Sequence, residues 1–254
     1  MPIIQSVERA LKILDLFDEH TTELKITEIS EKMGLHKSTV HSLLKTLQEY
    51  SYIGQNPEDG KYRLGLKLAE RGNFVISNID IRKAARKYLL DLSAKTGQTV
   101  HLGILDGREG VYIDKVEGEQ SIIRYSRIGR RLPLHSTAIG KVLLTYQNAP
   151  EFKRLLQDYH YQQQTLNTLT NEAVFQKELE KIKQQGFAID NQENEQGVRC
   201  AAVPIFNGTG KVLAAISIST LVSRVNDQEL SVFIDLLEAS SQELSEQMRY
   251  GYDV

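Results

Sequence analysis

The sequence has a single cysteine, no long apolar run and no large excess of charge of one sign. One cysteine, Cys200, excludes an intrachain disulfide framework. No apolar run approaches the roughly 18 residues of a membrane-spanning helix. The opening residues, MPIIQSVERALKIL, lack the basic segment and apolar stretch of a secretory signal. We therefore expect a cytoplasmic protein with no membrane partner.

The sequence also lacks the residue spacings of common metal and catalytic sites. Its six histidines form no HxxxH pair, and one cysteine cannot complete a zinc site. There is no phosphate-loop glycine pattern and no GxSxG motif. A thiol enzyme built from Cys200, His135 and Asp190 is conceivable, but Cys200 lies within a predicted strand and not at a helix start. We expect no metal, no cofactor and no catalytic centre.

Charge is balanced overall but unevenly distributed along the first 67 residues. The whole chain carries 31 basic and 33 acidic residues, a formal net charge of −2. Residues 1–31 hold three basic and seven acidic residues, a balance of −4, whereas residues 32–67 hold six basic and three acidic, a balance of +3. Phosphate binding requires such a positive segment. Its charge is modest, so we expect a dimer to double the contacts.

The segment 26–65 has the pattern of a winged helix-turn-helix. ITEISEKM predicts a short helix that ends at Gly34, and a longer helix is predicted over Lys37–Tyr50. Two short strand-like runs, joined at Asp59-Gly60, predict a β-hairpin. Together these elements place one helix in the major groove of double-stranded DNA.

The polar face of the Lys37–Tyr50 helix carries the predicted DNA contacts. Its N-terminal half reaches base edges in such folds, and the predicted base readers are Ser38, Thr39, His41 and Ser42. Basic side chains suit phosphates, and the predicted phosphate contacts are Lys37, Lys45, Lys61 and Arg63. Any amphipathic helix has a solvated polar face, so the interpretation depends on the flanking helix and hairpin.

The remaining sequence predicts an α+β protein of two domains and a linker. We expect a DNA-binding domain over 1–65, a linker helix over 66–79 and a GAF- or profilin-like domain over 80–254, with a mixed sheet flanked by helices. Expected caps are Ser6 and Asp80. The apolar residues expected to pack the first helix on the next two are Val7, Ala10, Leu11, Leu14 and Phe17. Predicted helices cover 6–18, 27–33, 37–50, 64–78, 81–96, 135–147, 149–159, 170–185 and 227–250. Predicted strands cover 99–107, 109–118, 121–129, 187–190 and a hairpin over 199–220.

Two features of the second domain predict a site for a small anion. Pro133 and Ser136 precede a helix whose first N–H groups and dipole suit a carboxylate. Ser217 and Ser219 are two residues apart on a predicted strand, so their hydroxyls share one face and need partners. Other polar residues nearby are interpreted structurally, His135 as ordering the loop before the helix, and Arg130, Arg131 and Arg199 as surface or interface charges.

Several stretches are similar to those of a known family. In the first half they are SVERALKILDLF, LHKSTVHSLLKTL and GKYRLGLKL, and in the second half residues 129–144 and 197–219. Over essentially its full length the chain resembles the IclR family of bacterial transcriptional regulators. One departure is Ser42, where the family often has arginine. The resemblance implies an effector site for a small organic acid, formed by Ala138, Ile139, Asp190, Val198, Cys200, Ser217 and Ser219.

The resemblance also implies a function and an assembly. We expect a DNA-binding regulator of a catabolic operon, a repressor rather than an activator, controlled by a small acid. Asp190 would accept a hydrogen bond from a ligand hydroxyl, which favours keto- or hydroxy-acids. Homodimers would pair through the winged helices, and homotetramers through the second domains. Two alternatives stay open, a second domain that only oligomerises and an enzyme acting on small keto-acids.

Overall fold

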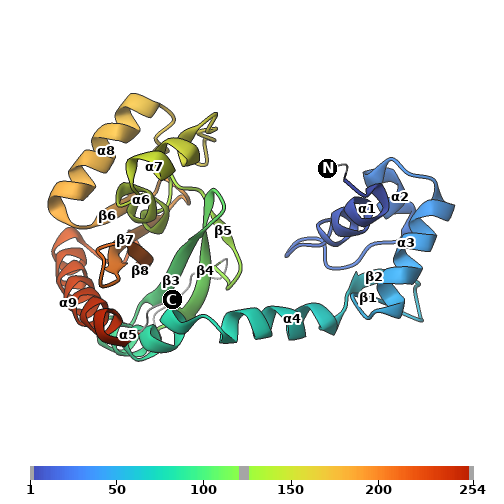
Figure 1. The fold of residues 1–254 in the computed structure, drawn as a ribbon, viewed down its shortest axis with the longest axis horizontal. Helices are drawn as coiled ribbons and strands as arrows, with labels where there is room; N and C mark the ends of the chain where they lie inside the picture. Colours follow the sequence, from blue (N-terminus) through green and yellow to red (C-terminus); the bar gives the residue numbers. More distant parts are fainter. Residues whose placement is uncertain (1–2, 120–125, 252–254) are drawn as a thin grey trace. The chain divides into compact units, whose positions relative to one another are not determined.

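The chain divides into two units, Met1–Asn78 and Ile79–Val254, each with a core of its own (Figure 1). The computed structural model describes residues 3–119 and 126–251. Within these residues no helix has the length and apolar character needed to cross a membrane. The elements of both units match an α+β protein, as the sequence predicted.

The first unit is a winged helix-turn-helix. A tight turn follows its second helix at Gly34, whose φ of +62° is the left-handed conformation that glycine adopts without strain. The wing is a two-stranded antiparallel hairpin in which Ile53 pairs with Leu64. The elements are α1 (Gln5–Leu14), α2 (Ile26–Met33), α3 (Lys37–Glu49), β1 (Ile53–Gln55), β2 (Tyr62–Leu64) and α4 (Leu66–Ser77).

Helix α1 packs through a narrower face than the sequence predicted. Ile13 is fully buried in the core of the first unit, whereas Val7 and Leu11 are 52% and 57% exposed. The expected packing of this segment is therefore right for Leu14 and Phe17, which join that core, and wrong for Val7 and Leu11 within this chain. The apolar residues of α1 span a wider arc than two neighbouring helices cover. Ser6 is no cap either, because the N-cap position is Ile4 and no side chain caps the helix.

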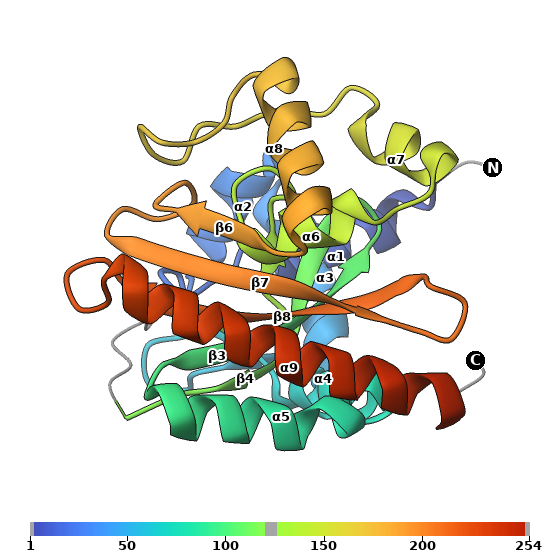
Figure 2. The same ribbon diagram turned by 90° about the vertical axis from the view of Figure 1, so that its left-hand side faces the viewer.

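The second unit is a six-stranded sheet between two layers of helices. Helices α5 and α9 lie side by side on one face, and α6 and α8 lie on the other (Figure 2). Its helices are α5 (Asp80–Thr96), α6 (Ala138–Thr145), α7 (Ala149–Leu156), α8 (Glu172–Gln185) and α9 (Asp227–Gly251). Its strands are β3 (Thr99–Asp106), β4 (Glu109–Val116), β5 (Arg131–Leu132), β6 (Ala188–Asn191), β7 (Val198–Phe206) and β8 (Val212–Leu221).

The strand order is β5-β4-β3-β8-β7-β6, and each neighbouring pair is antiparallel. The α+β class is confirmed. The expectation of a mixed sheet is wrong, because every pair of neighbouring strands is antiparallel. Its two hairpins, β3–β4 and β7–β8, join through β3 and β8, which run in opposite directions. No parallel crossover is needed for such an arrangement.

Two local predictions in this unit are wrong. Asp80 is the first residue of α5 and not its cap; its carboxylate lies 3.5 Å from Lys83 Nζ. The strand predicted over 121–129 is not found in its described part, and residues 121–125 lie outside the described residues. Residues 127–130 instead form a turn, with Gly129 at a φ of +86°. The strand follows that turn, as β5.

Candidate functional site

The exposed face of α3 carries six of the predicted DNA contacts. Val40 and Leu44 are fully buried and fix the helix against the core of the first unit. The opposite face remains open to a partner. Its side chains are half-buried at Thr39 and exposed at Lys37, Ser38, His41, Ser42 and Lys45.

The hydroxyl of Ser42 is partly engaged within the helix. Its Oγ donates to the carbonyl oxygen of Ser38 at 3.1 Å, which leaves its lone pairs to accept from a partner. A serine in this state reads a base donor, such as an exocyclic amine, rather than an acceptor.

The predicted phosphate contacts differ in whether their side chains already form ion pairs within the chain. Within the described residues, Lys45 and Arg63 are exposed and form no ion pair. Lys61 lies 3.2 Å from Asp59 Oδ2 and 3.9 Å from Glu23 Oε2. The hydrogen bond to Asp59 raises the pKa of Lys61 above its usual value. Lys61 would have to leave these two acids before binding a phosphate, so we expect it to be the weakest of the predicted phosphate contacts.

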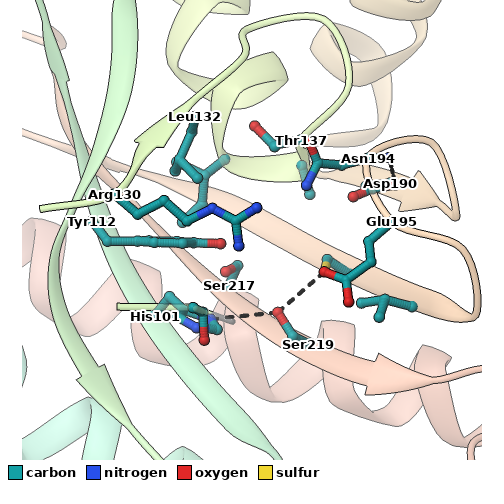
Figure 3. Close-up of a pocket in the computed structure, with 15 residues that line it drawn as sticks. His101, Tyr112, Arg130, Leu132, Thr137, Asp190, Asn194, Glu195, Ser217 and Ser219 are labelled. Carbon is teal, nitrogen blue, oxygen red and sulfur yellow. Dashed lines mark hydrogen bonds between the residues drawn. The ribbon is translucent and has the colours of Figure 1, made fainter. Parts of the chain in front are cut away.

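A pocket in the second unit lies between the sheet and the N-terminal end of α6 (Figure 3). The space between its side chains is about 480 Å³, open solvent at the mouth included, and about 30 Å³ of it admits the centre of a water molecule. The smaller volume has room for only about one or two water molecules, so an organic ligand requires some of the lining side chains to move. The lining includes all the residues that the resemblance implied, namely Ala138, Ile139, Asp190, Val198, Cys200, Ser217 and Ser219.

Strand register explains why these residues meet. Ser219 is paired with Cys200, and Cys200 with Asp190, across three neighbouring strands. His101 is paired with Ser217 across β3 and β8. Residues paired in register lie on the same face of a sheet. The pocket is thus assembled from strands that are more than a hundred residues apart in the chain.

Gly140, in the first turn of α6, lets the preceding loop pack closely against the helix. A Cβ on Gly140 would lie 2.4 Å from the carbonyl oxygen of Pro133, so only glycine fits. Thr137 caps the helix, since its hydroxyl accepts from the Gly140 N–H at 3.1 Å. The N–H groups at the start of α6, at Ala138 and Ile139, have no partner within the helix. They and the helix dipole favour an anion at this end.

Sequence reasoning placed Arg130 wrongly. It is half-buried and lines the pocket, whereas the sequence predicted a surface or interface charge. Arg131 is exposed and pairs with Asp106 Oδ2 at 2.7 Å. Neighbouring residues of an extended segment point to opposite sides, so the Arg130-Arg131 pair contained this signal. Other lining residues that the sequence missed are His101, Tyr112, Ser126, Leu132, Thr137, Asn194 and Glu195.

Arg199 and His135 have structural roles. The Arg199 guanidinium is largely buried and contacts Asp227 Oδ1 at 2.5 Å and the Val225 carbonyl at 2.8 Å, so it joins β7 to the start of α9 and is not a surface charge. His135 Nδ1 lies 3.0 Å from the Tyr159 hydroxyl, and its Nε2 lies 2.9 Å from the Gln162 carbonyl. The interpretation of His135 as a loop-ordering residue is confirmed.

Burial controls the ionisation of the pocket. Asp190 Oδ1 accepts from the N–H groups of Glu193 and Asn194 at 2.7 and 3.3 Å. Burial nevertheless raises the pKa of Asp190 to about 7. Burial also raises the pKa of Cys200, which stays a thiol and donates to Ser219 Oγ. A thiol of this kind is no nucleophile. Among the described residues, no three His, Cys, Asp or Glu side chains are grouped to hold a metal.

A buried lysine fastens α6 to the loop after β6. Lys141 Nζ lies 2.7 Å from Glu193 Oε1 and 3.3 Å from Glu178 Oε1, and it donates to the Ile189 carbonyl at 2.9 Å. Glu193 precedes the pocket residues Asn194 and Glu195 in the same loop. This ion pair therefore supports one wall of the pocket from behind. The signal in the sequence was that Lys141 is the only charged residue of the helix AIGKVLLT, and a helix that is apolar on all sides is buried.

Comparison with known proteins assigns both units. Residues 6–57 match the family described as IclR helix-turn-helix domain, and residues 73–246 match Bacterial transcriptional regulator IclR C-terminal. HTH-type transcriptional regulator XynR of Escherichia coli is 59% identical over 98% of this chain and 99% of its own length. KdgR of the same organism is 38% identical over 97% and 94%.

The fold agrees with a solved structure of the same kind. The crystal structure of Thermotoga maritima IclR is 38% identical, with a TM-score of 0.79 over 97% of this chain and 99% of that one. These relatives are transcriptional regulators and not enzymes, so the enzyme alternative is set aside. The chain belongs to the IclR family of bacterial, DNA-binding transcriptional regulators.

Proposed function

We propose that this protein is a cytoplasmic repressor of a catabolic operon, and that a small organic acid bound in the pocket controls its DNA binding. The observation that carries the proposal is the convergence of Arg130 with the first turn of α6 on one pocket (Figure 3). A ligand carboxylate there would meet a guanidinium, the N–H groups of the helix start and nearby serine hydroxyls. An apolar or cationic ligand would gain nothing from these groups.

Asp190 limits which acids fit. As a carboxylate it would repel the ligand, whereas its raised pKa allows it to carry a proton near neutral pH. The protonated form can exchange hydrogen bonds with a hydroxyl or carbonyl oxygen of the ligand. This supports a keto- or hydroxy-acid over a plain carboxylic acid.

The proposal includes a homodimer formed through the first unit. Val7 and Leu11 of α1 are exposed, and no residue of α4 is buried, with Phe74 and Val75 67% and 62% exposed. Apolar surface of this extent on a small unit is typical of an interaction site. A dimer would double the modest positive charge and match a palindromic operator. A homotetramer would need a further interface in the second unit.

We further propose how the two units communicate. Residues 1–65 bind DNA, residues 66–79 link, and residues 80–254 bind the effector and oligomerise. An acid that closes the pocket would favour one arrangement of the second units in the oligomer. Helix α4 would transmit that preference to the winged helices, so the acid changes operator affinity by shifting a population.

The test is fluorescence anisotropy of the full chain on its own upstream DNA, with and without a panel of keto- and hydroxy-acids. One acid should change the operator affinity. The Arg130→Gln variant should weaken that acid's binding about tenfold or more, because a hydrogen bond to a charged group is removed. The Arg131→Gln variant, whose side chain is exposed and paired with Asp106, is the matched control.

Two results would contradict the proposal in different ways. If no acid changes either the operator affinity or the melting temperature, the second unit only oligomerises. If an acid acts equally on the Arg130→Gln and Arg131→Gln variants, the pocket is not where it binds.

A further inference from the structure

Two polar atoms that line the pocket are buried without a hydrogen-bond partner among the described residues. They are Nε2 of His101 and Oγ of Ser126. His101 is 1% exposed and Ser126 is 6% exposed, so neither side chain is open to bulk solvent. Buried polar atoms in native proteins are nearly always paired. Of the seven such atoms among the described residues, these two line the same pocket, where a bound ligand can supply a partner to both.

The other ring nitrogen of His101 already has a partner. Cys200 Sγ donates to Ser219 Oγ at 3.1 Å, and Ser219 Oγ lies 3.4 Å from His101 Nδ1 (Figure 3). Because Ser219 Oγ accepts from Cys200, its own proton is available for Nδ1. With Nδ1 as the acceptor, the ring N–H is on Nε2, the unpartnered atom.

His101 stays neutral under ordinary conditions. Its ring is enclosed by the sheet, and Lys115 and Arg130 are close enough to oppose a second positive charge. Burial and these two cations lower the pKa of His101 to about 3. A neutral imidazole N–H binds a neutral acceptor, such as a hydroxyl oxygen, without a counter-ion.

The position of the donor is rigid. The ring of His101 stacks on Tyr112 with centroids 4.4 Å apart and planes 24° apart. Lys115, the register partner of His101 on β4, donates from Nζ to the Ser126 carbonyl at 2.7 Å. This bond holds Ser126 beside the same strand pair. Such fixed groups lose little freedom when a ligand binds.

We propose that His101 and Ser126 form a hydroxyl-binding subsite of this pocket. In it, His101 Nε2–H donates to a hydroxyl oxygen of the effector, and that hydroxyl donates to Ser126 Oγ. The inference rests on the proposed effector function and narrows it to a monocarboxylic hydroxy-acid, with its carboxylate toward Arg130. A dicarboxylate is disfavoured, because its second charge would be buried against two neutral groups.

The test measures binding of matched acids by isothermal titration calorimetry on the full-length protein. The probes are straight-chain carboxylic acids of three to six carbons, each beside its hydroxy derivatives and its dicarboxylic counterpart. At least one hydroxy-acid should bind about tenfold or more tightly than its parent. The dicarboxylic counterpart should bind no better than the parent.

Variants separate the subsite from the pocket as a whole. His101→Phe keeps the aromatic stack but removes the N–H, and Ser126→Ala is a smaller change should the first variant fail to fold. Each should reduce the preference for the hydroxy-acid over its parent acid to near onefold. Ser240→Ala alters a buried serine on α9, on the opposite face of the sheet, and is the control.

Each outcome has one meaning. If hydroxy-acid and parent bind equally well to the unaltered protein, or if the preference survives in both variants, the subsite is wrong and the effector pocket stands. If no acid of either kind binds, the proposed effector function itself is wrong, and the subsite with it.

Discussion

The DNA-facing side of α3 and the lining of the pocket are both polar, but their polar groups are in opposite environments. Those of α3 come from one helix and are exposed, as at His41 and Lys45. Those of the pocket come from several strands, a loop and a helix, and most are buried, as at Asp190 and Ser217. An exposed charge can therefore be removed with little cost to folding, whereas a buried one is part of the fold.

The largest expected difference is between two lysines. Lys141→Met leaves the carboxylates of Glu193 and Glu178 without their buried counter-charge. We expect a loss of about 3–5 kcal/mol in the free energy of unfolding. Lys45→Met, on an exposed face, should change it by no more than about 0.5 kcal/mol. Urea unfolding followed by circular dichroism measures both, and equal midpoints for the two variants would refute the comparison.

The second prediction concerns pH. The pKa of Asp190 is about 7 in the folded chain, against about 3.9 when unfolded. The folded state therefore holds an extra proton between these values, so stability should fall as pH rises toward 7. The slope is at most about 1.4 kcal/mol per pH unit. The pKa of Glu193 is also raised by burial and contributes in the same direction.

Asp190→Asn should remove much of this slope. The amide oxygen can still accept from the Glu193 and Asn194 N–H groups, so the loop is preserved. Melting temperatures at pH 5, 6, 7 and 8 test the prediction. The melting temperature of the variant, relative to that of the unaltered protein, should be highest at pH 8. Parallel curves would mean that Asp190 is ionised throughout that range.

The third prediction concerns the exposed face of α3. Lys45→Ala should weaken binding to every DNA sequence and reduce the salt slope of the binding constant by about 0.9 for each phosphate that is no longer neutralised. Its effect on stability should be negligible. Lys95→Ala, which removes an exposed lysine paired with Asp91 in the second unit, is the control. An unchanged salt slope for Lys45→Ala would remove Lys45 from the DNA interface.

The smallest effect is expected at Lys61. Because Asp59 and Glu23 already neutralise this lysine, Lys61→Ala should alter the salt slope by less than half as much as Lys45→Ala. The same anisotropy titrations at several salt concentrations measure it. A full-sized effect would show that DNA displaces both acids.

The local pattern of apolar residues was sufficient to predict most of the helices and strands. It predicted the β7–β8 hairpin, and it predicted α3 and α5 to within two residues. It failed where burial of a side chain depends on contacts with other elements. The apolar spacing of α1 was read correctly, but it could not say that Val7 and Leu11 lack a cover within the chain.

The pocket was predictable only in part. Residues within the family motifs, such as Ala138 and Ser219, could be carried over by position. His101 could not, because its link to Ser219 spans 118 residues and arises only when β3 pairs with β8. Arg130 was missed because the strand was predicted over 121–129, whereas β5 begins at Arg131, so the alternation of Arg130 and Arg131 was not considered.

The sequence by itself determined the helices and strands, the polar face of α3 and the family of the protein, because these depend on neighbours in the chain. Only the tertiary structure decided which charges are buried. Lys45 is exposed on α3, whereas Lys141 lies on α6, all of whose residues are buried, and its ammonium is enclosed by α8, β6 and the loop after β6. Burial removes water from a charge, and that depends on segments remote in sequence closing over it.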